Sequence, residues 1–282
     1  MNQMKKQMRR IGYELSRTPL RVPLVWMRHR GLQPNDVLLA SFPRSGNTWL
    51  RFILAEILTG RPIDFDNINH FIPEMGMQRG AAAVLPGSGH LIKTHETYRP
   101  QYRRAIYVVR DFRHVVLSAY ARALSLGMLH NTSFDEFLPT MLDGKGSRVG
   151  SWHDHVNSWL DCPLSRNGGL LVMRYEDLRQ NSEDNLLKML DFLGVKIERD
   201  KVRQALTNNT LSRMKSKEDK SKTLPTHATE GGRFVRTGSV GAWQNELTPK
   251  QVEDVLRYAG PALSRMGYDT SLPTAEMEAV AK

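Results

Sequence analysis

Short apolar runs alternate with longer segments of helical period along much of the chain. The run DVLLAS at residues 36–41 is bounded by turn residues and predicts a buried strand. Residues 48–58 place apolar side chains at helical spacing, which predicts a helix directly after that strand. The same alternation predicts strands at residues 90–95 and 104–110 and within LLVMRYEDL, and helices at residues 111–126, 183–193 and 200–206, with Asp111 as an N-cap.

This order of elements predicts an α/β fold in three layers, with a central parallel sheet flanked by helices. Ligands of such sheets bind at the carboxyl ends of the strands. The residues expected there are nearly all basic: Arg44, Lys93, His95, Arg110 and Tyr175. The strand ends therefore predict a site for an anionic ligand.

The chain has 282 residues, which fits one α/β domain. We expect a basic N-terminal arm at residues 1–34, a single domain at residues 35–270 and a tail at residues 271–282. Residues 212–243 show no clear period, and the Arg and Gly residues at their end favour a lid over the site. Residues 75–89 are a second candidate flap.

Charge supports an anionic ligand. The chain has 40 Lys and Arg against 29 Asp and Glu, a net charge of +11. Such an excess attracts nucleotides, phosphate, sulfate, nucleic acid or an acidic membrane face. Its first thirty residues carry eight Lys and Arg against one Glu. That arm could lie on an anionic membrane, or it could be a solvated helix packed on its own domain.

Several classes of protein and site are not expected. The single cysteine, Cys162, excludes an internal disulfide framework and a multi-cysteine metal site. No metal site is expected in WHDHVNSW either, because adjacent helical residues point in different directions, and this segment should line a pocket or cover the core. No apolar run approaches the roughly 20 residues that span a bilayer. We expect a cytoplasmic protein, with the arm as a peripheral membrane contact at most.

The segment SFPRSGNT joins the first strand to the first helix. A loop before a helix N-terminus presents free N–H groups and a favourable dipole to a phosphate. Gly46 and Thr48 match the phosphate-loop pattern of nucleotide triphosphatases, but Asn47 replaces its lysine. The loop therefore predicts a phosphate site with its charge on Arg44, and argues against hydrolysis of ATP or GTP.

SFPRSGNTWLR resembles the 5′-phosphosulfate loop of sulfotransferases that use 3′-phosphoadenosine 5′-phosphosulfate (PAPS). YVVRDFRHVVLSAY is similar to the 3′-phosphate segment of that family, and FVRTGSVGAW resembles its R-x-G-x-x-G-x-W segment. KTH and YEDL also match in type and order. The resemblance spans about residues 36–263 and implies a fold like that of the P-loop nucleotide hydrolases, with PAPS as donor and adenosine 3′,5′-bisphosphate as product.

The resemblance implies roles for individual residues. The residues implied to bind the cofactor are Arg44, Ser45, Gly46, Asn47, Thr48, Trp49, Arg110, Ser118, Tyr175, Arg236, Thr237 and Gly238. Among these, the loop would bind the 5′-phosphate, the arginines at 110 and 236 with the serine at 118 would clamp the 3′-phosphate, and Trp49 and Tyr175 would contact adenine. By the same resemblance, His95 would be the general base for the acceptor hydroxyl, because an unperturbed pKa of about 6.5 suits that task. Lys93 and Arg44 would stabilise charge on the sulfuryl group.

Two departures from the family pattern are visible. Arg44 stands where many cytosolic members have lysine, so its role would be electrostatic rather than proton donation. Leu211 stands where soluble members often place an aromatic residue beside adenine, so one stacking face could be lost. Taken alone, Trp49 could equally be a core residue and Arg110 a partner in an ordinary salt bridge.

Other functions remain to be weighed. A nucleotide-dependent kinase would need the lysine that the loop lacks. A nucleic-acid-binding protein would interleave its basic residues with aromatic ones, whereas here they cluster with glycines. We therefore expect no nucleic-acid partner.

The acceptor pocket is expected from residues 75–89, 124–151 and 212–235, which suit a carbohydrate hydroxyl, a lipid headgroup or a small hydrophobic alcohol about equally. The oligomeric state stays open.

Overall fold

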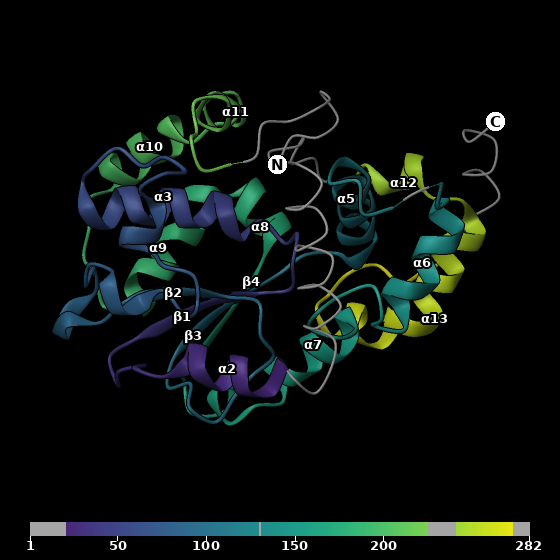
Figure 1. The fold of residues 1–282 in the computed structure, drawn as a ribbon, viewed down its shortest axis with the longest axis horizontal. Helices are drawn as coiled ribbons and strands as arrows, with labels where there is room; N and C mark the ends of the chain where they lie inside the picture. The colour runs from purple at the N-terminus through teal and green to yellow at the C-terminus, as the bar shows by residue number, and fades with distance from the viewer. Residues whose placement is uncertain (1–20, 130, 225–240, 273–282) are drawn as a thin grey trace.

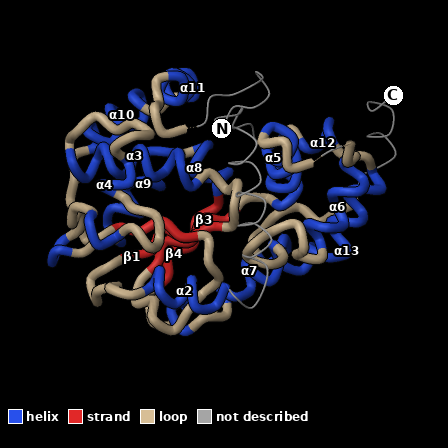
Figure 2. The backbone as a smooth tube through the Cα atoms, viewed as in Figure 1, coloured by secondary structure: helices blue, strands red, loops and turns tan. Residues whose placement is uncertain are grey.

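The fold is built on four parallel strands in the order β2-β1-β3-β4, which form the red sheet at the centre of Figure 2. The computed structural model describes residues 21–129, 131–224 and 241–272. The strands are β1 Val37–Ser41, β2 Leu91–Thr94, β3 Ala105–Val109 and β4 Leu170–Arg174. Leu38 lies opposite Ile92 on one side and Ala105 on the other. The inner strand β1 therefore ends between β2 and β3. The loop of residues 41–48, called the phosphate loop below, begins there.

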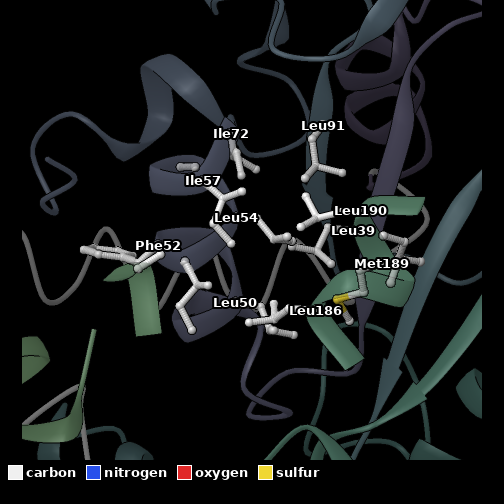
Figure 3. Close-up of a cluster of buried hydrophobic side chains, with 14 of the residues drawn as sticks. Leu39, Leu50, Phe52, Leu54, Ile57, Ile72, Leu91, Leu186, Met189 and Leu190 are labelled. Carbon is white, nitrogen blue, oxygen red and sulfur yellow. The ribbon is translucent and has the colours of Figure 1, made fainter. Parts of the chain in front are cut away.

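Helices cover one face of the sheet (Figure 1). They are α3 Asn47–Thr59, α4 Ile68–Phe71, α8 Tyr175–Gln180, α9 Ser182–Phe192, α10 Arg199–Asn208 and α11 Leu211–Asp219. Leu39 and Leu91 of the sheet pack there with Leu50 and Leu54 of α3 and Leu190 of α9 (Figure 3). Alternate strand residues supply this core, because successive side chains of a strand point to opposite faces.

The other face is covered by α5 Phe112–Ser125, α6 Phe134–Leu142, α7 Trp152–Leu160 and α13 Pro249–Arg265. Its core holds stacked rings: Tyr102 and Tyr107 each lie parallel to Trp159, with ring centres 5.7 Å and 5.5 Å apart. The remaining α-helices of the described residues are α2 Arg21–His29 and α12 Trp243–Glu246. The predicted α/β fold with three layers is therefore confirmed.

The helix after β3 begins as its sequence predicts. The Asp111 side chain accepts a hydrogen bond from the backbone N–H of Arg113, which confirms it as the N-cap of α5. The same carboxylate receives the Arg113 guanidinium through Nε and Nη2, at 2.9 and 2.7 Å. This buried pair fixes the start of the helix that carries Ser118.

One prediction for the loops needs correction. The expectation of no regular structure across residues 212–243 is wrong for its first part, because α11 occupies Leu211–Asp219. The turn after α11 is held by Asp66, whose carboxylate accepts hydrogen bonds from the backbone of Lys222 and Thr223. Residues 225–240 lie outside the described part of the chain.

The second candidate flap, residues 75–89, contains two short 3₁₀ turns, Gln78–Gly80 and Pro86–Ser88. Its start is tied to β2, because the backbone N–H of Met75 donates to the carbonyl of Lys93 at 2.8 Å. In the described residues, no helix is long and apolar enough to cross a membrane. The same ranges contain no group of three or more candidate metal ligands.

Candidate active site

The phosphate loop turns sharply between β1 and α3. Arg44 and Gly46 have positive φ values of 73° and 85°. A Cβ atom added at Gly46 would lie 2.4 Å from Cδ2 and Cε2 of Tyr175. Glycine is therefore required at this position both for its conformation and for the close approach of the tyrosine ring.

The polar groups of the loop are arranged around the start of α3. The Asn47 side-chain amide donates to the Leu39 carbonyl at 3.0 Å and to the Ser41 hydroxyl at 3.1 Å, so it braces the loop against β1. The Ser45 hydroxyl is buried and has no hydrogen-bond partner among the described residues. The first N–H groups of a helix also lack partners within the helix. These unsatisfied donors fit a bound phosphate.

A second anion-binding group lies where β3 ends and α5 passes the loop. Arg110 donates to the Arg44 carbonyl at 3.3 Å, and Arg44 Nε donates to the Ser118 hydroxyl at 3.0 Å. The Arg110 guanidinium carbon lies 4.6 Å from the centre of the Tyr175 ring. Burial lowers the pKa of Arg110, and the neighbouring Tyr175 and Glu176 oppose that shift. Two arginines and a hydroxyl thus meet beside the loop.

His95 follows β2 and points to the same edge of the sheet. Its Nδ1 lies 2.7 Å from the Ser41 carbonyl, which can only accept, so Nδ1 carries the hydrogen. The other ring nitrogen, Nε2, then holds the lone pair. Burial, followed by the charge of Lys93, lowers the pKa of His95 to about 3. The expectation of an ordinary histidine pKa is therefore wrong, and the ring is neutral at physiological pH.

Lys93 is held by an acid that the sequence did not indicate. Its ammonium group donates to Glu74 Oε1 at 2.7 Å, and Arg51 lies 3.7 Å from the same oxygen. Burial alone would raise the pKa of Glu74, but the charges of Lys93 and Arg51 outweigh it and lower the pKa to about 2. Burial lowers the pKa of Lys93, and Glu74 partly offsets that shift. Lys93 is therefore fixed in place beside His95.

His155 on α7 supports His95 from behind. Its Nε2 lies 3.2 Å from the His95 carbonyl, and the Tyr107 hydroxyl lies 2.9 Å from its Nδ1. A neutral ring that donates through Nε2 and accepts at Nδ1 satisfies both contacts. Burial lowers the pKa of His155 to about 4. The sequence predicted that WHDHVNSW lines a pocket or covers the core. Trp152, His155 and Trp159 are buried, so these residues of the segment cover the core.

A cavity of about 850 Å³ opens onto His95, Lys93 and Arg44. Its walls come from α2, the start of the 75–89 segment, α5, α6 and the loop that follows α6. It meets the phosphate loop only at residues 42–44, and Ser45 and Thr48 do not line it. A cavity of this size suits a drug-sized molecule. It therefore provides room for a second reactant next to the phosphate site.

These features agree with the family that matches the sequence. A family model described as the sulfotransferase domain matches residues 34–267. The chain belongs to the sulfotransferase family. This match confirms the predicted family and, with it, the predicted class of enzyme.

Named relatives cover most of this sulfotransferase. Sulfotransferase 1A1 of Mus musculus is 29% identical over 243 residues, which cover 78% of this chain and 81% of the relative. Sulfotransferase 1E1 of Bos taurus is 27% identical over 238 residues, which cover 77% of this chain and 79% of the relative.

Solved structures share the fold. A mouse sulfotransferase, SULT7A1, complexed with PAP (adenosine 3′,5′-bisphosphate) aligns with a TM-score of 0.63 and 22% identity, over 86% of this chain and 91% of the other. A retinol dehydratase in complex with androsterone and PAP aligns with a TM-score of 0.67 and 19% identity, over 89% and 85%. At these identities the likeness supports the fold alone.

The predicted site residues of this sulfotransferase lie together where they are described. One group lies around the phosphate loop and includes Arg110, Ser118 and Tyr175. The other group, Lys93 and His95, lies at the end of β2. Arg236, Thr237 and Gly238 lie outside the described residues. The end of their segment lies on α5, because the backbone N–H of Gly241 donates to His114 Nε2 at 2.8 Å. His114 could not be singled out from the sequence, since only the fold places it there.

Trp49 lies beside the loop rather than inside the core. It is half-buried, its ring centre is 6.3 Å from that of Tyr175, and its Nε1 donates to the Asn209 carbonyl at 3.0 Å. The Arg179 guanidinium carbon lies 5.0 Å from the ring centre. Leu211 is the first residue of α11 and is half-buried. Contact of Trp49 with adenine and the loss of a stacking face at Leu211 stay predictions.

Proposed function

We propose that this sulfotransferase moves a sulfuryl group from PAPS to a hydroxyl of an acceptor in the cavity, with His95 as general base. The observation that carries the proposal is that the cavity meets the phosphate loop beside His95. His95 Nδ1 is bonded to Ser41, the last residue of β1, and the cavity reaches the loop through Arg44. An acceptor oxygen beside His95 Nε2 would therefore lie next to the loop that holds the donor.

The donor follows from the family, and the loop of this chain fits it. The buried, unpartnered Ser45 hydroxyl and the first N–H groups of α3 would hold the 5′-phosphate. Arg110 and Ser118 would hold the 3′-phosphate, since the planar guanidinium fork suits phosphate. Asn47 stands in place of the lysine of triphosphatases and is engaged with β1, which disfavours a kinase.

Bound PAPS would supply the sulfuryl group, whose bond to phosphate breaks as the bond to the acceptor oxygen forms. The His95 ring would take the acceptor proton at Nε2, while its Nδ1–H stays with the Ser41 carbonyl. Lys93 and Arg44 would place positive charge where negative charge develops. Because Glu74 holds Lys93, the ammonium group is oriented before the reactants arrive.

Replacing His95 by asparagine tests the base. Asparagine can still donate to the Ser41 carbonyl but has no basic nitrogen. The turnover number should fall by about 10²- to 10⁴-fold, the usual contribution of a general base. His70→Gln, at an exposed histidine on α4, is the control and should leave turnover unchanged. Turnover of the His95→Asn variant within twofold of wild type would refute the role.

The donor is tested separately by thermal unfolding with adenosine 3′,5′-bisphosphate, ADP and ATP. Ligand at about 100 times its Kd adds roughly 2.7 kcal/mol of stability. We expect a shift with the bisphosphate and a smaller one with the other two. A shift with ATP alone would favour the kinase instead.

We also propose a cytoplasmic location with peripheral membrane contact through α2. This helix exposes Val22, Trp26 and Met27, with exposed fractions of 68%, 61% and 57%, and arginines follow them at positions 28 and 30. Apolar and basic groups together favour an anionic membrane surface. Co-sedimentation with phosphatidylglycerol vesicles tests this. Trp26→Ser should weaken binding, and equal binding to neutral phosphatidylcholine vesicles would contradict the electrostatic part.

A further inference from the structure

The acceptor cavity carries positive charge beyond what the donor needs. Its lining includes four cations away from the phosphate loop: Arg28, Arg122, Lys145 and Arg148. They come from α2, α5 and the loop after α6. Its two acids are engaged near the sheet edge, where Glu74 binds Lys93 and Glu96 lies 3.7 Å from Arg99. The cavity is therefore an anion-attracting environment.

These cations are separated from the residues that fit the donor. The cavity meets the phosphate loop only at residues 42–44, and neither Arg110 nor Tyr175 lines it. The phosphates of the donor would lie on the other side of Arg44. A second anion, on the acceptor, would account for the charge that remains.

Arg148 is the cation best placed for this task. It is exposed, lines the cavity and forms no salt bridge within residues 21–129, 131–224 and 241–272. Its charge also reaches Lys93, because it contributes to the lowered pKa of that ammonium group. Lys145, by contrast, is paired with Asp143 at 2.7 Å. An anion beside Arg148 would therefore lie within electrostatic range of the catalytic edge.

Part of the cavity wall is apolar. It is formed by Leu126, Met128, Leu129, Phe137 and Met141. Apolar surface of this kind favours a hydrocarbon or aromatic body. The cavity thus combines a reactive end, an apolar wall and a cationic rim.

We infer that the acceptor is an anionic amphiphile, with its hydroxyl at His95, its apolar body against α6 and the residues that follow α5, and a carboxylate or phosphate at Arg148. This deepens the proposed function and rests on it. An anion at this position would also oppose the field of Lys93 and Arg148 and so favour the charged form of His95 after it takes the proton.

The test compares acceptors that share one apolar body. We would use an alkanoic acid that carries a 4-hydroxyphenyl group at the end of its chain, the methyl ester of that acid and the corresponding alkyl phosphate. The measurement is kcat/KM for each at low salt. The two anions should exceed the ester by about fivefold or more, and the ratio should shrink with added salt. Preference for only one of them would decide between carboxylate and phosphate. An ester as good as both anions would overturn the inference.

Variants locate the charge that recognises the anion. Arg148→Gln should lower the anion-to-ester ratio by about two- to fivefold, the range for one exposed ion pair, and Arg148→Lys should restore most of it. Lys201→Gln, at an exposed lysine on α10, should leave the ratio unchanged. An unchanged ratio in Arg148→Gln would overturn the assignment.

Failure of the proposed function is distinguishable from failure of this inference. If the bisphosphate stabilises the protein and neutral acceptors are sulfated equally well, the proposed function stands and the anionic acceptor is excluded. If the bisphosphate gives no stabilisation and no acceptor is sulfated, both are excluded.

Discussion

Gly46→Ala tests whether the phosphate loop needs glycine for the two reasons that the structure gives. Gly46 has φ 85°, and a left-handed conformation costs a non-glycine residue about 1–2 kcal/mol. The new methyl group would also lie 2.4 Å from two ring atoms of Tyr175, a distance at which one of them must move. Overpacking of this kind costs about 1–3 kcal/mol. The two costs together predict a loss of about 2–5 kcal/mol.

Urea unfolding measures the loss, and Gly60→Ala is the matched control. Gly60 has φ 66° and open space around its added Cβ, so its substitution carries the conformational cost without the collision. We expect Gly46→Ala to be the more destabilising by about 1–3 kcal/mol. Combining it with Tyr175→Ala should recover most of that difference. Equal losses in the two alanine variants would refute the collision with Tyr175.

Three further predictions concern buried polar groups. Because the pKa of His95 is about 3, kcat/KM with a neutral acceptor should stay flat from pH 7 to pH 5, and an acid limb near pH 6.5 would contradict this. The pKa of His155 is about 4 in the fold and about 6.5 when unfolded, so the unfolded state binds more protons between these values. The contribution of His155 to the free energy of unfolding is therefore complete above about pH 6.5 and falls below that pH by up to about 1.4 kcal/mol per pH unit. The free energy of unfolding of His155→Gln, measured with urea, should depend less steeply on pH than that of the wild type. Tyr268→Phe removes a 2.7 Å hydrogen bond to the buried Glu176, whose pKa burial already raises, and should cost about 1–3 kcal/mol by thermal unfolding; no loss would mean that water replaces the hydroxyl.

The sheet and the loop after β1 were predictable because their signals are local. Short buried runs mark the strands, and the turn residues of SFPRSGNT mark the junction with α3. The helix α11 was missed because its sequence, LSRMKSKED, is largely polar, with Met214 as its buried apolar residue. Contacts from distant residues hold it, such as the Phe52 ring, whose centre lies 5.3 Å from the Lys217 ammonium nitrogen. The periodicity of hydrophobic residues does not indicate such long-range contacts.

The sequence indicates candidate site residues but not their electrostatics. His95 and Lys93 could be singled out because they alternate at the end of a strand. The depressed pKa of His95, the grip of Glu74 on Lys93 and the support from His155 arise between segments 19 to 60 residues apart. Only the folded chain brings their charges and hydrogen bonds together.

The carbonyl of Ser41 holds the ring of His95 where many catalytic histidines are held by a carboxylate. A carboxylate would favour the charged ring, whereas the surroundings here leave the pKa at about 3. A base that weak takes a proton only as the acceptor oxygen bonds to sulfur and its hydroxyl becomes acidic. If His95 is the base, an acceptor that the cavity holds in line with the donor is therefore favoured over water that moves freely in the empty cavity. Positioning, rather than base strength, would then limit futile hydrolysis of the donor.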